Sequence, residues 1–185
     1  MNPKIQQSGV TMVELITVIL IGAILTAIAV PSYKYVTNAN RVSGEINSLL
    51  GDLQFTRYEA IKEGLQVTIC PTASATTTIC DVGSTTWSEG WIVLSNPLAQ
   101  KPSAVLRRQL PFSSFESFDT LTTPAGVNQV IFNREGFSTG AAGTVMFSLH
   151  SESGNSSFTR CLMVSAAGSL ATTAVGNVVY SATCS

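Results

Sequence analysis

The fold is decided near the N-terminus by the stretch VTMVELITVILIGAILTAIAVPSY, residues 10–33. From Val10 to Val30 nearly every residue is apolar, and these 21 residues are enough for a helix to span the roughly 30 Å hydrocarbon core of a membrane. The stretch holds one charged residue, Glu14. Because a carboxylate at membrane depth is costly, its presence calls for a partner or a function.

Two ordinary interpretations of this segment leave Glu14 unexplained. Lys4 followed by an apolar run is typical of a secretory signal peptide, but the run is longer than the usual core of about 7–15 residues. A plain transmembrane anchor fits the length of the run. Neither interpretation accounts for an acidic residue four positions into the apolar segment.

The short polar leader MNPKIQQSG, residues 1–9, followed by this apolar run resembles the N-terminus of type IV pilins and of type II secretion pseudopilins. The resemblance implies that a prepilin peptidase cleaves between Gly9 and Val10, that the new N-terminus at Val10 is methylated, and that the apolar helix is retained. Counted from Val10, Glu14 is the fifth residue and Pro31 the twenty-second, and both match the family. Val10 itself departs from the Phe that is usual after the cleavage site.

Cleavage would give Glu14 a partner. The new α-amino group has a reference pKa near 8 and would lie one helical turn from Glu14. We expect Glu14 to pair with this amine in its own chain, or with that of a neighbouring subunit, and in the latter case to set the axial register of assembly. We also expect a helix break near Gly22 and Pro31, because glycine lowers helix propensity and proline removes a backbone hydrogen bond.

The helical period continues beyond Pro31, so the sequence predicts one helix from Val10 to about Glu63, roughly 80 Å long at about 1.5 Å per residue. Gly64 is a natural C-terminal cap. The predicted apolar stripe of the second half consists of Val42, Ile46, Leu49, Leu50, Leu53, Ala60 and Ile61. The charged residues expected mostly off this stripe are Arg41, Glu45, Asp52, Arg57, Glu59, Lys62 and Glu63.

Beyond Gly64 the chain is rich in Ser, Thr and Gly, and short β-type runs alternate with turn signals. The predicted strands are residues 65–70, 90–95, 104–110, 128–133, 143–150, 160–166 and 177–184. The pattern predicts an α+β fold in which the long helix packs on an antiparallel, β-sandwich-like head. The expected divisions are a leader (1–9), a transmembrane half-helix (10–31), an amphipathic half-helix (32–64) and the head (65–185).

The chain has four cysteines, Cys70, Cys80, Cys161 and Cys184. An even count behind an export-type N-terminus favours disulfides in an oxidising compartment. There is no CxxC pair, so no metal site is predicted. Three pairings are possible, and the sequence-local choice joins Cys70 to Cys80 and Cys161 to Cys184, each bond stabilising the fold by roughly 2–4 kcal/mol.

Sequence segments of the head indicate more specifically which group of pilin-like proteins the chain resembles. The segments LLGDLQFTRYEAIKEGLQVTIC (49–70), WSEGWIVL (87–94), VIFNREGF (130–137) and RCLMVSAAGSL (160–170) resemble the FimT/FimU-type minor pilins and their pseudopilin relative GspH. The resemblance implies a minor pilin that helps initiate type IV pilus assembly in the tip complex, with prepilin peptidase, other minor pilins and the major pilin as partners. It implies a single-pass inner-membrane protein with a periplasmic head, then a pilus on the cell surface. A GspH-type pseudopilin of type II secretion and a DNA-uptake pilin stay open as alternatives.

Nothing in the sequence predicts an enzyme or a cofactor. His150 is the only histidine and lies in a predicted strand, and there is neither a phosphate-binding loop nor an HExxH motif. Trp87 and Trp91 are interpreted as packing residues. The carboxylates of the head are scattered and carry no catalytic motif: Asp81, Glu89, Glu116, Asp119, Glu135 and Glu152.

The charge balance does not favour nucleic-acid binding. The net charge is −1, and residues 65–185 hold five basic and six acidic residues, whereas Lys and Arg contacts to phosphate dominate non-specific DNA affinity. The adjacent Arg107 and Arg108 would point to opposite faces of a strand. In DNA-binding relatives a GRxR-like stretch follows the strand equivalent to CLMVS. Here Gly168 matches it, but Ser169 and Ala171 take the arginine positions.

Overall fold

The computed structural model describes residues 9–74, 76–96, 104–112, 119–139, 143–180 and 182–184. The chain forms two compact units, Met1–Asn38 and Ala39–Ser185. The predicted leader lies outside the described residues except for Gly9, and so does Glu116.

The first unit consists, in its described part, of the beginning of helix α1 (Met12–Glu63). The hydroxyl groups of Thr17, Thr26 and Thr37 donate to backbone carbonyls three or four residues earlier, so these polar groups are satisfied within the helix. The helix continues without interruption through Gly22 and Pro31. The kink or loosening expected there, where proline removes one backbone hydrogen bond, stays a prediction.

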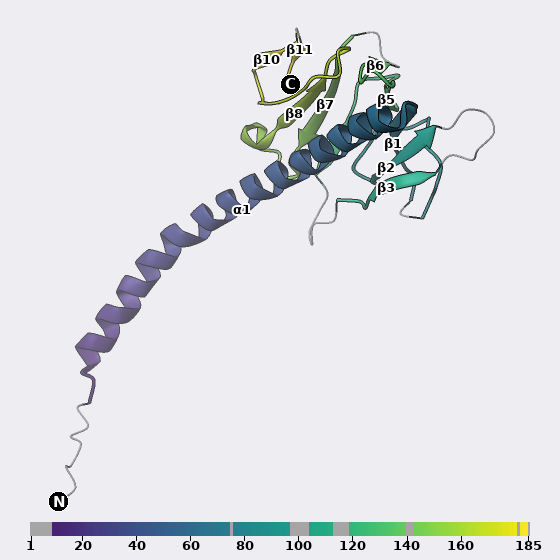
Figure 1. Cartoon of the computed structure of the whole chain (residues 1–185). Helices are drawn as coiled ribbons and strands as arrows, with labels where there is room; N and C mark the ends of the chain where they lie inside the picture. Colours follow the sequence, from purple (N-terminus) through teal and green to yellow (C-terminus); the bar gives the residue numbers. More distant parts are fainter. Residues whose placement is uncertain are drawn as a thin grey trace, which may run out of the picture. The chain divides into compact units, whose positions relative to one another are not determined.

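In the second unit the rest of α1 lies along the head (Figure 1). Most of the predicted stripe is buried, including Leu49 and Leu53, which are fully covered. Leu50 is partly buried, but Ile61 is half exposed, so the stripe ends one residue earlier than predicted. Two acidic residues predicted to lie off the stripe, Asp52 and Glu59, are buried as well.

The described part of the head has two larger antiparallel sheets and one hairpin (Figure 1). The first sheet has the order β3-β2-β1-β5-β6 and the second the order β4-β7-β8-β9, while β10 pairs with β11. The strands of the first sheet are β1 (Gln66–Pro71), β2 (Trp91–Asn96), β3 (Val105–Gln109), β5 (Val130–Phe132) and β6 (Ser138–Thr139). The others are β4 (Thr120–Thr122), β7 (Val145–His150), β8 (Arg160–Val164), β9 (Leu170–Ala174), β10 (Val178–Val179) and β11 (Ala182–Thr183), and a short 3-10 helix η1 spans Ser156–Phe158.

One apolar core joins these elements. It contains Leu49 and Leu53 of α1, Ile69 of β1, Phe132 of β5 and Leu162 of β8, all fully buried. Since α1 and both larger sheets contribute to this one cluster, they form a single packed head, and the predicted α+β pilin-type architecture is confirmed.

The strand predictions are correct for the apolar runs and incomplete elsewhere. Each predicted run contains a strand, but the last, residues 177–184, is a hairpin, β10 and β11, with Tyr180 between them at a φ of 49°. Three further strands, β4, β6 and β9, were not predicted. The segment between the first two predicted strands carries the fully buried Trp87, which packs edge-on against Phe147 with ring centroids 4.9 Å apart.

The four cysteines form two disulfides, Cys70–Cys80 and Cys161–Cys184, which is the sequence-local pairing. The first joins β1 to the loop that follows it. The second joins β8 to the end of the hairpin β10–β11, so the C-terminal hairpin is fixed covalently to the second sheet. Both bonds restrict the unfolded chain and so stabilise the head.

Candidate functional site

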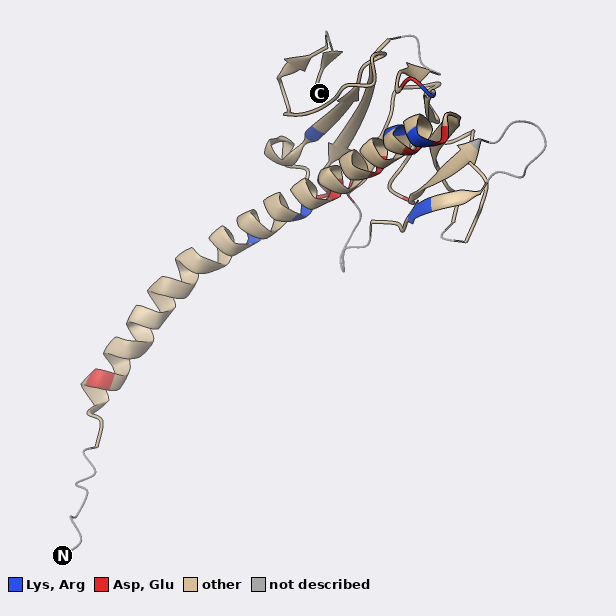
Figure 2. Ribbon diagram, in the orientation of Figure 1, with Lys and Arg blue, Asp and Glu red and all other residues tan. Residues whose placement is uncertain are grey.

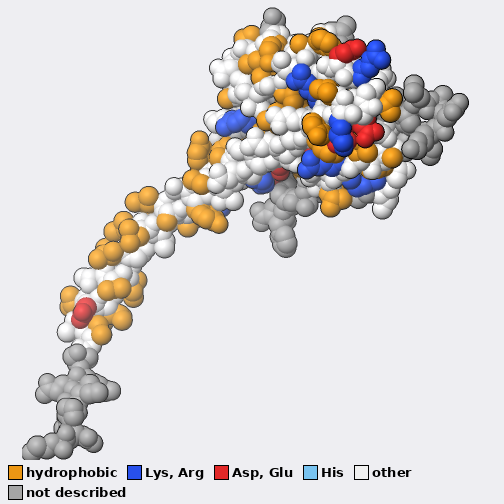
Figure 3. Space-filling model, in the orientation of Figure 1, with side chains coloured by type: hydrophobic (Ala, Val, Ile, Leu, Met, Phe, Trp, Pro, Cys, Tyr) orange, Lys and Arg blue, Asp and Glu red, His pale blue; other side chains and the backbone are white. Residues whose placement is uncertain are grey.

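The apolar part of α1 offers a continuous surface for another apolar partner. From Val10 to Val36 the large hydrophobic side chains are all at least half exposed, and Leu20, for example, is 57% exposed. Figure 3 shows apolar side chains along the visible face of this stretch, whereas apolar, basic and acidic groups are interspersed on the head. By length and composition, α1 contains one segment apolar enough to cross a membrane.

Glu14 is the one acidic residue of this surface. In Figure 2 the N-terminal stretch of α1 is tan apart from a red position near its start, whereas blue and red positions gather on the head and the adjoining part of the helix. Its carboxylate makes no ion pair with the described residues. A carboxylate in an apolar segment of this kind is costly at membrane depth unless it is paired.

Thr11 and Glu14 also begin the helix. The backbone carbonyl of Thr11 accepts the first helical hydrogen bond, from the N–H of Leu15 at 3.1 Å, and its hydroxyl accepts from the N–H of Glu14 at 3.3 Å. This is one half of a capping box, in which a Thr at the cap is followed three residues later by Glu. The sequence TMVE carries the signal for this role, which was not predicted, so Glu14 has a local structural explanation beside the electrostatic one.

In the head, Asp52 of α1 fastens the first sheet to the helix. It is 3% exposed, accepts a hydrogen bond from the Trp91 indole N–H at 2.8 Å, and pairs with the Arg107 guanidinium at 2.9 Å. Arg107 also lies over the Phe55 ring, 5.3 Å from its centre. The buried acid is therefore satisfied on both carboxylate oxygens, and Trp91 is a packing residue as predicted.

A second cluster fastens the other sheet. Asp119, whose side chain is fully covered, accepts two hydrogen bonds from Arg41, at 2.9 and 2.7 Å, and one from the backbone N–H of Glu152. Burial would raise the pKa of Asp119, but the hydrogen bonds from Arg41 and Glu152 outweigh it, and the pKa lies below its usual range. The contact with Asp119 in turn raises the pKa of Arg41.

Glu45 adjoins this cluster from the next turn of α1. Burial, together with the neighbouring Asp119 carboxylate, raises the pKa of Glu45 to about 8. One of its carboxyl oxygens is buried and has no hydrogen-bond partner among the described residues. A pKa of about 8 favours the protonated form of Glu45 at neutral pH in the folded head.

Arg57 of α1 lies at the junction of both sheets. Its guanidinium donates to the backbone oxygen of Gly168 at 2.9 Å, in the turn between β8 and β9. Gly168 has a φ of +75°, and a Cβ there would come within 2.0 Å of the Gly136 oxygen, in the turn between β5 and β6. The glycine that matches the DNA-binding motif is thus required here by the close approach of two turns.

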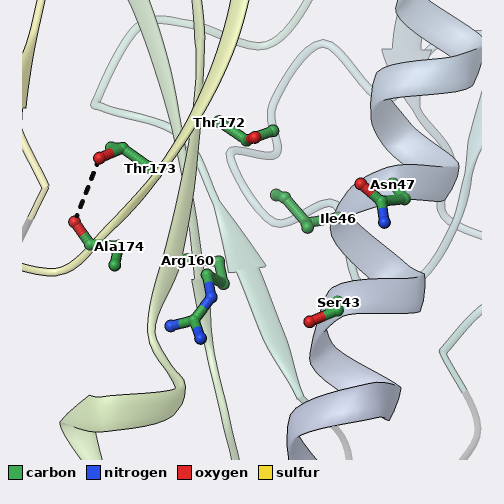
Figure 4. Close-up of a pocket in the computed structure, with 7 residues that line it drawn as sticks. All are labelled: Ser43, Ile46, Asn47, Arg160, Thr172, Thr173 and Ala174. Atoms are coloured by element: carbon green, nitrogen blue, oxygen red, sulfur yellow. Dashed lines mark hydrogen bonds between the residues drawn. The ribbon is translucent and has the colours of Figure 1, made fainter.

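Two hollows open on the head beside α1. One, of about 260 Å³, lies between α1 and the strands β8 and β9, and Figure 4 shows Ser43 and Ile46 reaching into it from the helix and Arg160 and Thr172 from the sheet. The other, of about 400 Å³, lies near the C-terminal end of the helix and is lined by Gln54, Arg57, Tyr58, Ile61 and Leu170.

The structure brings together few of the residues that a catalytic centre would need. His150 is exposed, and its Nδ1 lies 3.5 Å from the Thr159 hydroxyl. Within the described ranges no three His, Cys, Asp or Glu side chains could hold a metal ion. The groups that do converge, around Asp52 and Asp119, join α1 to the strands.

Two solved structures share this fold. Both are crystal forms of the type IV minor pilin FimU from Pseudomonas aeruginosa, each 19% identical to this chain and aligned with 71% of it. They match with TM-scores of 0.56 and 0.51 over 87% and 90% of their own length. No curated protein matches the chain significantly in sequence.

A family model adds a match in sequence. It is the model described as type II transport protein GspH, and it covers residues 45–168, from the second half of α1 to the turn at Gly168. This span is well over half of the 185 residues and includes the helix stripe from Ile46 onward, both tryptophans and the first three cysteines. The chain therefore belongs to the GspH family of pilin-like proteins, with the fold of the minor pilin FimU.

Proposed function

We propose that this protein is a minor pilin of a type IV pilus that helps to initiate assembly in the tip complex. The observation that carries the proposal is the exposed apolar part of α1, with Glu14 as its only acid, in a chain whose head has the FimU fold. Exposing the apolar side chains of such a helix to water is unfavourable, so the helix is held either by a membrane or by the helices of other subunits.

The proposed path begins in the inner membrane, with residues 10–31 spanning it and the head in the periplasm. Prepilin peptidase cleaves between Gly9 and Val10, and the amine of Val10 is methylated. The helix then leaves the lipid for the filament core, where the apolar surface of α1 meets equivalent surfaces of other minor pilins and of the major pilin. Loosening near Gly22 and Pro31 accompanies this step.

Glu14 sets the register in this proposal. In the low dielectric of the core an amine–carboxylate pair is far stronger than in water, so a subunit shifted along the axis would leave both charges unpaired. The capping contact with Thr11 gives a competing explanation, in which Glu14 only begins the helix. The two explanations differ in whether the charge matters.

The test compares substitutions at these two positions in the native host. Glu14→Gln keeps a residue that suits the capping box but removes the charge, Glu14→Val removes both, and Thr11→Ala removes only the cap. We expect both Glu14 variants to be membrane-inserted and processed but at least about tenfold depleted from sheared filaments, since the lost pair is worth more than about 1.4 kcal/mol. Thr11→Ala should assemble nearly normally.

Mass spectrometry of the mature chain provides the control for processing, because the proposal requires an N-terminus at methylated Val10 in every variant. Normal incorporation of Glu14→Gln would contradict the register role and leave capping as the explanation. An intact leader, or a start beyond the apolar run, would contradict the proposal as a whole.

The second candidate is a GspH-type minor pseudopilin of type II secretion, and the description of the matching family model favours it. The same helix and head would then enter a short pseudopilus instead of a surface pilus. Deleting the gene separates the candidates: loss of surface pili supports the first, and loss of protein secretion with pili intact supports the second.

A further inference from the structure

Among the described residues that line the hollow between α1 and the strands β8 and β9, Arg160 is the one with a positive charge. Arg160, the first residue of β8, donates two hydrogen bonds from Nη1, to the backbone oxygens of Ser157 and Thr159, both at 2.9 Å. These bonds hold one terminal nitrogen in place, so the guanidinium is oriented before any ligand arrives. No carboxylate in the described part of the chain pairs with Arg160, in contrast to Arg41, Arg107 and Arg134.

The strand register places Arg160 on the side of the sheet that faces the helix. Arg160 pairs with Ala174, and Leu162, which belongs to the core, pairs with Thr172. Alternate residues of a strand share a face, so Arg160, Thr172 and Ala174 continue the face of Leu162 past the edge of the core. Thr173 points the other way, as Figure 4 shows, with its hydroxyl toward the oxygen of Ala174.

The other residues that line the hollow are uncharged, and some of them are polar and others apolar. Ser43, Asn47 and Thr172 carry hydroxyl and amide donors, and Asn47 and Thr172 are exposed at the rim, where a partner can reach them. Ile46, which is 4% exposed, provides an apolar wall beside them. Among the residues that the structure describes, no acidic side chain lines the hollow. A cation with neutral donors and a small apolar wall suits a carboxylate on a short apolar stem.

The volume of the hollow limits the size of the ligand that it can hold. Sites for small molecules usually enclose about 300–1,000 Å³ and bury most of the ligand. This hollow has about 260 Å³ and an open rim, which is room for one amino-acid side chain and not for a separate cofactor. The carboxylate therefore fits best as a side chain projecting from a protein surface.

We propose that this hollow is a recognition pocket for a single glutamate or aspartate side chain of a neighbouring pilin-type subunit, with Arg160 as its anchor. The identity of the neighbour rests on the proposed function, because a minor pilin is surrounded by other pilins once assembled. The chemistry of the pocket does not, since it follows from residues of this chain alone. The pocket gives the head a specific lateral contact in addition to the apolar packing of α1.

The test uses the full-length chain in detergent micelles and two matched probes. N-acetyl-glutamate methylamide carries the carboxylate, and N-acetyl-glutamine methylamide has the same shape without the charge. Amide signals of Ser43, Asn47 and Thr172 are followed by NMR during titration to about 50 mM, within the range expected for a single exposed-rim ion pair. We expect saturable shifts with the glutamate probe and none with the glutamine probe.

Three variants sharpen the test. Arg160→Gln should weaken binding of the glutamate probe by at least about tenfold, because a charge-assisted pair is lost. Thr172→Val should weaken it about two- to fivefold, as expected for one neutral hydrogen bond. Ala174→Asp places a carboxylate opposite Arg160 in the strand register, so it should occupy the pocket from within and abolish probe binding while the head stays folded.

Arg108→Gln is the matched control, because Arg108 lies in β3, away from the hollow, and its loss should leave probe binding unchanged. The proposal is overturned if the wild-type chain shows no saturable shift, if the glutamine probe or sodium acetate binds as well as the glutamate probe, or if Arg160→Gln binds like the wild type. Probe binding does not require assembly, so these results are independent of the Glu14 variants.

Discussion

Between Met12 and Asn38 helix α1 buries none of its side chains, whereas between Ala39 and Glu63 it buries a stripe that forms part of the head core. Up to Pro31 the first part is apolar on nearly every side, whereas the second is apolar only on one, so the two parts need different surroundings. The head supplies the surroundings of the second part within the same chain. Those of the first part must come from outside it, from lipid or from other subunits.

The acidic residues of the two parts of α1 also differ in whether they have partners within the chain. Asp52 and Glu59 are buried in the second part with partners at hand, Trp91 and Arg107 for the former and Lys62 for the latter. Glu14 in the first part makes no ion pair with any described residue. Asp52 and Glu59 thus have partners within the described part of the chain, whereas an ion-pair partner for Glu14 would have to come from elsewhere, as the proposed function expects.

The largest expected effect comes from a matched pair of leucines. Leu53→Ala, in the fully buried stripe, should lower the free energy of unfolding of the head by about 2–5 kcal/mol, because it leaves a cavity in a packed core. Leu20→Ala, at a position 57% exposed in the first part, should change it by less than about 0.5 kcal/mol.

Urea unfolding of the full chain in detergent measures both variants. Trp87 and Trp91 are fully buried in the head, so their fluorescence reports on the head alone. Equal losses of unfolding free energy in the two variants would contradict the expected difference between the two parts of α1, since they would mean that the apolar part contributes to the stability of the head.

A smaller effect is expected from a matched pair of acids. Asp52→Asn keeps one oxygen acceptor but turns an N–H donor toward either Trp91 or Arg107, so it should cost about 1–3 kcal/mol. Glu14→Gln should leave the same unfolding curve unchanged. An Asp52→Asn head as stable as the wild type would show that the buried acid is not what holds the first sheet to the helix.

The sequence was sufficient for the elements whose pattern is local. Helix α1 follows from an unbroken helical period, and the apolar runs became strands because alternation of apolar residues is the signature of a half-buried strand. The strands that were missed, β4, β6 and β9, all lie at edges of their sheets. An edge strand buries less, so it needs no apolar alternation, and the polar sequence LATTA of β9 carries none.

The buried charges could not have been predicted in the same way. Arg41 and Asp119 are 78 residues apart, and nothing near either of them in sequence marks the other as a partner. Asp52 and Glu45 look like solvent-facing residues of an amphipathic helix until the sheets are placed against it. The capping role of Thr11 and Glu14, by contrast, can be predicted from four consecutive residues, because a Thr followed three residues later by Glu is a local signal.

The smallest expected effect concerns pH. Glu45 has a pKa of about 8 in the folded head, raised by burial and by Asp119, and an ordinary value near 4.5 in the unfolded chain. Between these two values the folded head holds a proton that the unfolded chain has lost, so rising pH favours unfolding. The head should therefore lose stability from pH 5 to pH 8, by about 1–2 kcal/mol, because solvent screens a group that is only partly buried.

Glu45→Gln tests this expectation, since glutamine resembles the protonated acid and does not titrate. The variant should unfold at nearly the same urea concentration at pH 5 and pH 8, while the wild type unfolds more easily at pH 8. Asp119 contributes in the opposite sense: its lowered pKa adds stability that is lost only as the pH falls below about 4, so it is constant across this window. The difference between the pH dependences of unfolding of the wild type and the variant isolates the contribution of Glu45. An identical pH dependence in both proteins would mean that Glu45 is ionised in the folded head. Because α1 and the second sheet meet at this residue, the same measurement shows whether the contact between them depends on a proton.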